Sequence, residues 1–264
     1  MKYSYCIGVT CSDRKEAFLR TIKSIRDCGY EGELIILDDG STTINHSETF
    51  QIFPKARIFK NKIKTCSPCM ATYLLMQIYA TSSDSLNIVF VESDMIVSQK
   101  FTDVMPDLVA STAHDGIFTI YNSLMHPGQR IEGNWVYKSI IPFAGTVISR
   151  TIIKDVMEKV NFREPYHVEL SNYLRRVGKR LASTRVSFLQ HLILHEDRHN
   201  DQRLRSIGRE FVGVTSAENE LMIEQLYMYI RKLEQKIFEL QSELKVMENT
   251  IGNVIKRTDE FYRG

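Results

Sequence analysis

The sequence predicts an α/β domain with a mostly parallel sheet flanked by helices, followed by one long helix that forms a coiled coil. Short apolar runs of strand length alternate with helix-length patterns through the first 110 residues. Strands separated by such patterns form right-handed βαβ units and a parallel sheet. From Thr215 onward the pattern is helical without interruption. We therefore expect two units, a globular domain over residues 1–213 and an oligomerisation helix over residues 214–264.

The first part of the domain contains two clear helix starts between its strands. Asp13 should cap the first helix, with Glu16 as its capping-box partner, and Gly29 should end it. Ser67 followed by Pro68 predicts the start of another helix, because serine caps N-termini and proline suits the first turn. The expected strands cover residues 3–10, 33–38, 56–59 and 87–92.

The second part of the domain is less regular. Residues 195–213 are polar and rich in arginine, which predicts a loop or lid. The elements expected before that segment are strands at residues 116–121, 135–140, 145–149 and 185–190, and helices at residues 151–159 and 169–177.

Composition narrows the class of protein. The 34 Lys and Arg residues balance 32 Asp and Glu residues, so the net charge of +2 predicts no nucleic-acid partner. No apolar run approaches the ~20 residues of a membrane-spanning helix, and we expect no transmembrane segment. No secretory signal is evident at the N-terminus. The cysteines are odd in number and confined to the first 70 residues, which favours a reducing, cytoplasmic location.

Two acidic pairs follow expected strands. Asp38 and Asp39 precede Gly40, and such a turn suits recognition of a base N–H and ribose hydroxyls, although an Asx-turn is an equal alternative. Glu92 and Asp94, separated by Ser93, could share one Mg²⁺ or Mn²⁺ ion and through it a diphosphate. The alternative for this second pair is a solvated loop. Ligands of α/β sheets bind at the carboxyl ends of strands, where both pairs stand.

Residues 5–10, Arg14 and residues 34–42 resemble the opening of family 2 glycosyltransferases, and residues 87–94 resemble the strand that carries their Asp-x-Asp motif. The resemblance extends roughly over residues 3–192. It implies a GT-A fold, a UDP-, GDP- or dTDP-sugar donor, and inversion at the anomeric carbon.

The resemblance also implies roles for individual residues. Thr10 and Arg14 would border the nucleotide, Asp38 would contact the base or ribose with Asp39 beside it, and Asp94 would bind the metal. Glu92 departs from the motif by its longer side chain, so it would bind the metal directly or contact ribose or water, with Ser93 at the donor.

An inverting transfer needs a base for the acceptor hydroxyl. The family places an acid near the start of the helix that ends, here, at Gly178. Glu169 is the favoured candidate and Glu164 the second. The family's usual Glu-Asp pair is replaced near this register by Tyr166 and His167. The alternative is that Glu169 is a surface residue in the first turn of the helix, where its charge is stabilised by the helix dipole.

His191 resembles the histidine that supplies a metal ligand at a strand end in some GT-A enzymes. A neutral imidazole suits a site shared with carboxylates. The alternative is a histidine that only packs or lies at the surface.

The C-terminal helix carries a heptad repeat over residues 219–254. β-Branched residues at a with leucine at d favour a parallel dimer, with a tetramer as the alternative. A single amphipathic helix lying on the domain is the other interpretation. The a positions are Ile223, Ile230, Ile237, Leu244 and Ile251, and the d positions are Leu226, Leu233, Leu240, Met247 and Val254.

Together these observations predict a metal-dependent, inverting glycosyltransferase of the hexosyltransferase kind. It would move a sugar from a nucleotide-sugar donor to a hydroxyl of a glycan or another acceptor, with Mn²⁺ or Mg²⁺ as cofactor and as a homo-oligomer. Two alternatives remain. A nucleotidyltransferase would show a glycine-rich phosphate loop after the first strand, whereas a non-catalytic coiled-coil scaffold would bind no nucleotide-sugar.

Overall fold

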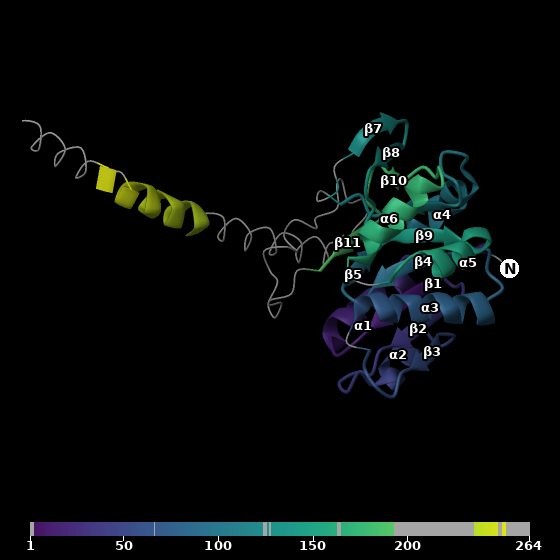
Figure 1. Ribbon diagram of the computed structural model, residues 1–264. Coiled ribbons are helices and arrows are strands. Elements are labelled where there is room, and N and C mark those ends of the chain that lie inside the picture. The colour runs from purple at the N-terminus through teal and green to yellow at the C-terminus, as the bar shows by residue number, and fades with distance from the viewer. Residues whose placement is uncertain are drawn as a thin grey trace, which may run out of the picture. The chain divides into compact units, whose positions relative to one another are not determined.

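The computed structural model describes residues 3–65, 67–123, 126, 128–162, 165–192, 235–247 and 250–251 (Figure 1). The chain divides into two compact units, Met1–Val214 and Thr215–Gly264. The first unit holds the sheet and its helices, and the described part of the second is helical. No helix among the described residues is long and apolar enough to cross a membrane.

The first unit is built on a mixed sheet, of which nine strands lie in the described part of the chain. Their order is β3-β2-β1-β4-β9-β6-β10-β8-β7. Neighbours from β3 to β4 are all parallel, whereas β9 and β8 run against their neighbours. The strands are β1 (Tyr5–Cys11), β2 (Leu34–Asp38), β3 (Arg57–Lys60), β4 (Asn87–Glu92), β6 (Ile117–Thr119), β7 (Gly128–Glu132), β8 (Trp135–Lys138), β9 (Thr146–Ser149) and β10 (Ala182–Thr184).

Helices cover both faces of this sheet, which confirms the predicted α/β class (Figure 1). Buried residues of α1 and α4 join one apolar core with Tyr5, Ile7 and Val9. Those of α3, α5 and α6 join a second core on the opposite face with Ile88 and Phe90. The helices are α1 (Lys15–Asp27), α2 (His46–Ile52), α3 (Pro68–Ser82), α4 (Phe101–Ala110), α5 (Arg150–Lys159) and α6 (Tyr166–Arg176).

Gly8 in the middle of β1 allows α3 to pack closely on the sheet. A Cβ atom at this position would lie 2.8 Å from Ile88 Cδ1 and 3.1 Å from Leu75 Cδ2. The missing side chain therefore makes room for an isoleucine of β4 and a leucine of α3 at the centre of the parallel strands.

One predicted cap is confirmed and one is wrong. The Ser67 hydroxyl accepts a hydrogen bond from the Met70 backbone N–H at 3.4 Å, with proline in the first turn as expected. Asp13, by contrast, does not cap α1, because Arg14 occupies the N-cap position and makes no side-chain cap bond. Asp13 instead adopts a positive φ of 47° and turns its carboxylate to the loop after β2.

The structure also contains elements that the sequence pattern does not predict. They are α2, α4, β7, β10 and β5 (Met95–Val97), while the last described strand is β11 (Leu189–His191). Helix α4 has Pro106 in its interior, a residue that normally argues against a helix. Strand β7 is exposed throughout, so its residues lack the apolar alternation of a buried strand.

The described residues of the second unit, 235–247 and 250–251, are helical and all exposed. Their heptad positions Ile237, Leu240, Leu244, Met247 and Ile251 have between 53% and 59% of their surface accessible. These apolar side chains are thus exposed in the single chain. The coiled coil, in which a second chain would bury them, stays a prediction. The other heptad positions and the predicted lid lie outside the described residues.

Candidate functional site

The carboxyl ends of β1, β2 and β4 meet at one edge of the sheet because these strands are parallel neighbours. Thr10 lies opposite Leu37 of β2 and Glu92 of β4, and Cys11 lies opposite Asp38. Both predicted acidic pairs and Thr10 therefore belong to the same edge. This is the edge at which parallel sheets bind ligands.

A separate two-stranded ladder brings His191 to this edge. Strand β5 follows Asp94 directly, and it pairs antiparallel with β11 so that His191 lies opposite Met95. The backbone N–H of Leu192 donates to the carbonyl of Asp94 at 2.7 Å. The ladder thus fixes the histidine beside an acid that precedes it by about 100 residues in the chain.

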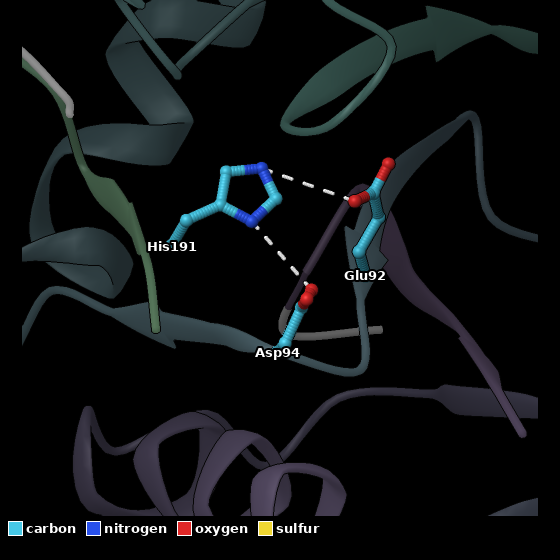
Figure 2. Close-up of side chains that lie close together, drawn as sticks. All are labelled: Glu92, Asp94 and His191. Atoms are coloured by element: carbon cyan, nitrogen blue, oxygen red, sulfur yellow. Dashed lines mark ion pairs between the residues drawn. The ribbon is translucent and has the colours of Figure 1, made fainter. Parts of the chain in front are cut away.

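Glu92, Asp94 and His191 point toward one another (Figure 2). The His191 Nδ1 atom lies 3.5 Å from Asp94 Oδ1, and its Nε2 atom lies 3.8 Å from Glu92 Oε2. One ligand atom from each residue fits within 4.8 Å of the other two. The side chain of Asp94 is 5% exposed and that of Glu92 is 42% exposed, so the cluster is anchored in the protein and open on the glutamate side.

These residues fit a divalent cation. One cation takes a single imidazole nitrogen and an oxygen from each carboxylate, and one such set of three atoms lies within 4.8 Å. Ligands that bind one ion at ~2.1 Å can be at most ~4.2 Å apart, so a small movement of the partly exposed Glu92 would bring the set within that limit. Carboxylate oxygens with one imidazole suit Mn²⁺ or Mg²⁺, as predicted for this trio.

Arg14 contributes positive charge to the same cluster. Its Nη1 atom donates to Asp94 Oδ2 at 2.8 Å, while the other oxygen of Asp94 faces His191. Arg14 stands at the N-cap of α1, and its side chain is 39% exposed. The structure therefore brings a guanidinium to the edge of the predicted metal site. Ser93 lies between the two acids and is half-buried.

Asp38 is used differently from Asp94. Its side chain is completely buried, and it accepts a hydrogen bond from the Ser41 backbone N–H at 2.7 Å. Its Oδ2 atom also lies 2.7 Å from His46 Nε2 and 3.3 Å from Lys60 Nζ. All these partners belong to the protein, so the predicted contact of Asp38 with a base or ribose stays a prediction.

Asp39 organises the loop that follows β2. Its Oδ1 atom accepts from Asn61 Nδ2 at 2.9 Å, and its Oδ2 atom accepts from the Thr65 hydroxyl at 2.7 Å. Gly40 has a φ of 69°, and a Cβ atom there would lie 2.7 Å from the Lys64 backbone nitrogen. Glycine is therefore required, both for the turn and for the close approach of residues 61–65.

Asp13 holds the same loop from the other side. Its Oδ1 atom accepts from the Thr42 backbone N–H at 2.7 Å, and its Oδ2 atom lies 3.2 Å from Lys64 Nζ. The Thr42 bond and the lysine lower the pKa of Asp13 to about 2. Three acids thus converge on one loop, and His46 and Asn61 are partners that the sequence pattern did not identify.

Of the two predicted bases, the structure describes only Glu169, which is not part of the cluster. Glu169 is exposed on α6, where it lines a shallow hollow with Asn172, Arg175 and Arg176. Glu164 lies outside the described residues. A role for either acid stays a prediction.

A pair of histidines lies at the start of α6 instead. The ring centroids of His126 and His167 are 5.7 Å apart, and both side chains are partly buried. Burial holds the pKa of His126 at about 4, with smaller effects of His167 and Lys138, and burial also lowers the pKa of His167. The replacement of the family's usual acids by Tyr166 and His167 was the one sequence signal for this pair.

The fold is similar to that of S. aureus TarS. TarS 1–349 matches 70% of this chain and 59% of its own length, with a TM-score of 0.53 and 10% identity. In complex with UDP-GlcNAc, TarS 1–349 matches 75% of this chain and 60% of its own length, with a TM-score of 0.54 and 10% identity. The chain thus spans about 60% of the length of these relatives, and the likeness concerns the fold.

The sequence itself matches no family in a scan of known protein families. A search of curated proteins likewise finds no match.

Proposed function

We propose that this chain is a metal-dependent glycosyltransferase that moves a sugar, with inversion, from a nucleotide-sugar to a hydroxyl of a glycan or another acceptor. The observation that carries the proposal is the cluster of Glu92, Asp94 and His191 at the carboxyl edge of the sheet. It is supported by the fold shared with TarS, a glycosyltransferase whose structures include complexes with UDP and with UDP-GlcNAc. A UDP-sugar is therefore the first donor to test, ahead of GDP- and dTDP-sugars.

Asp94 and His191, with Glu92 directly or through water, would hold Mn²⁺ or Mg²⁺. A cation bound there supplies positive charge that stabilises the negative charge on a departing nucleoside diphosphate. Arg14 can exchange its bond to Asp94 for a bond to phosphate, because its side chain is partly exposed and guanidinium pairs well with phosphate oxygens. Thr10 and Ser93 flank the carboxylates at the same edge.

The nucleoside would lie against the loop that follows β2. In this proposal Asp38 and Asp39 act first as anchors, because their oxygens bind Ser41, His46, Lys60, Asn61 and Thr65. A direct bond from Asp38 to a ribose hydroxyl or base N–H would replace one of these contacts.

Residues 1–213 would form the catalytic domain, and residues 214–264 would join copies of the chain into a homo-oligomer, a dimer by preference. The exposed apolar stripe on residues 235–251 supports this part of the proposal. Light scattering on the full chain and on a chain ending at Gly213 tests it, and a monomeric full chain at micromolar concentration would contradict it. Cys6, Cys11 and Cys28 are buried free thiols, which suits the cytoplasmic location that we propose.

The deciding experiment is a donor panel. UDP-, GDP- and dTDP-sugars are titrated by calorimetry with Mn²⁺, with Mg²⁺ and with a chelator, and nucleotide release is measured for each. We expect one nucleotide class to bind, with affinity and release that depend on the cation. Failure of every nucleotide-sugar to bind in the presence of either metal would overturn the proposal.

A further inference from the structure

We infer that His167 is the base that takes the proton of the attacking hydroxyl, and that His126 lies beside it as a neutral partner. The inference rests on the proposed function and names a residue for a step that Glu169 was expected to perform. It follows from the orientation of α6, from a series of aromatic contacts that joins α6 to β4, and from the segment that carries His126.

The helical period directs His167 toward the protein and Glu169 away from it. His167 stands three residues before Leu170 and four before Ser171, and such spacings share a helix face. Leu170 and Ser171 are completely buried. Glu169 shares its face with Asn172 and Arg176, which line the same exposed hollow. A base on the face of His167 therefore points inward, whereas one at Glu169 points to solvent.

A series of contacts between aromatic rings places the first turn of α6 beside the end of β4. Phe90 of β4 contacts Phe143 at a centroid distance of 4.7 Å, and Phe143 contacts Tyr166 at 5.1 Å. Side chains alternate along a strand, so Glu92 leaves β4 on the same face as Phe90. The residue after Tyr166 is His167, and it thus begins the helix on the face of the sheet toward which Glu92 projects.

His126 lies in a second segment, one that also contacts His191 of the metal cluster. It belongs to the segment after β6, in which the Tyr121 ring packs edge-on against His191 at 5.2 Å. The His126 backbone N–H donates to the carbonyl of Ser123 at 3.4 Å, and Lys138 Nζ donates to the same carbonyl at 3.2 Å. The two histidines therefore meet from two separate elements, α6 and the segment whose Tyr121 contacts His191.

The environment assigns different roles to the two rings. Burial alone lowers the pKa of His167, whereas the pKa of His126 is lowered further by the charges of His167 and Lys138. Near neutral pH both rings are uncharged, and an uncharged imidazole can accept a proton. Because the pKa of His126 is about 4, this ring remains neutral near neutral pH, and His167 is the ring that we assign as the base.

Proton transfer to His167 accompanies the transfer of the sugar. The acceptor oxygen forms a bond to the anomeric carbon of the donor sugar, and its proton moves to a ring nitrogen of His167. The bond between that carbon and the phosphate oxygen breaks, and its electron pair leaves with the nucleoside diphosphate. Water can replace the sugar hydroxyl as the acceptor, and its proton follows the same path.

The test compares His167→Gln and His167→Gly with Glu169→Gln, a control on the same helical turn whose side chain faces solvent. Each full-length protein is given the donor that the wild-type chain releases fastest in the panel, with water as acceptor. We measure nucleotide release, donor affinity by calorimetry and thermal stability. Both His167 variants should lose about 100-fold or more in kcat, with donor affinity kept, since a general base contributes factors of this size.

Added imidazole should restore part of the release by His167→Gly, because it can occupy the space of the missing ring and accept the proton. Such rescue is not expected of a residue that only packs. Glu169→Gln should retain wild-type release. Full activity of His167→Gln, or an inactive and still folded Glu169→Gln, would overturn the inference and leave the proposed function standing. A wild-type chain that binds no nucleotide-sugar would contradict the proposed function itself.

Discussion

The acids after β2 and the acids after β4 occupy equivalent places in the sheet, on either side of β1. Asp38 and Asp94 are both buried, yet their oxygens face different partners. Those of Asp38 meet a backbone N–H, a histidine and a lysine of the loop that follows it. Those of Asp94 meet His191 and Arg14, which come from distant parts of the chain and can turn to a ligand.

The difference lies in the loops rather than in the acids. Residues 41–65 return to Asp38 and Asp39 with enough N–H and O–H donors to satisfy both carboxylates. The chain after Asp94 instead continues directly into β5, which pairs with β11 and brings His191 to the second pair. We propose that the first pair stabilises the fold and that the second carries the chemistry. The following predictions separate the two roles.

The largest effect is expected for Asp94→Asn. The substitution keeps the shape of the side chain but removes the charge that would hold the cation, so the rate of nucleotide release should fall by about 10²–10³. Thermal stability should change little. The rate of nucleotide release is measured for both proteins as a function of Mn²⁺ concentration. Near-normal, metal-dependent turnover by Asp94→Asn would show that Asp94 does not bind the metal.

Asp38→Ala should act on stability instead. It leaves the buried Ser41 N–H and the His46 ring without the carboxylate that they share, and each buried polar group left without its partner costs about 1–3 kcal/mol in the free energy of unfolding. Urea denaturation of Asp38→Ala and Asp94→Asn side by side provides the measurement. An equal loss of stability in both variants would show that the two acidic pairs contribute to the fold in the same way.

Glu92→Gln sharpens the comparison within the second pair. Glu92 is more exposed than Asp94 and its ligand atom lies farther from His191, so an indirect contact through water is expected. Apparent Mn²⁺ affinity should then fall by about 10-fold, the size of effect seen for groups that support a metal ligand. If Glu92→Gln lowered the apparent Mn²⁺ affinity as much as Asp94→Asn does, Glu92 would be a direct ligand.

The smallest effect concerns Asp13 and appears only in acid. Its pKa is lowered to about 2 in the folded chain, against ~3.9 when unfolded, so its contribution is complete above pH ~4 and is lost as the pH falls through ~2. Asp13→Asn should remove this part of the acid sensitivity. Urea midpoints at several pH values below ~5 test it, and identical pH profiles of the two proteins would contradict the role of Asp13.

The parallel half of the fold could be predicted from sequence because each strand is a continuous apolar run. Strands β1, β2, β3 and β4 fall within two residues of their expected bounds, and helix α3 begins at Pro68 as expected. Helix α4 was missed since Pro106 interrupts its pattern, and β5 and β10 are too short, at three residues each, to show a period.

The residues of the candidate site likewise divide into those that a local pattern predicts and those that long-range contacts bring together. Glu92 and Asp94 were expected together because they follow one strand, and their position at the sheet edge follows from parallel topology. The location of His191 depends on the β5–β11 ladder, a pairing between distant segments that no local pattern encodes. The burial of Asp38 depends on His46 and Lys60, which come from α2 and β3, so its internal partners were equally hidden.

The β5–β11 ladder also has a consequence for how the protein acquires its site. In a chain made from its N-terminus, the two carboxylates are synthesised about 100 residues before His191, and closing so long a loop is a slow event in folding. The trio can be complete only once β11 has paired with β5. A cation that prefers the complete trio would favour the chain in which this ladder has formed, and its binding would report the pairing of β5 with β11.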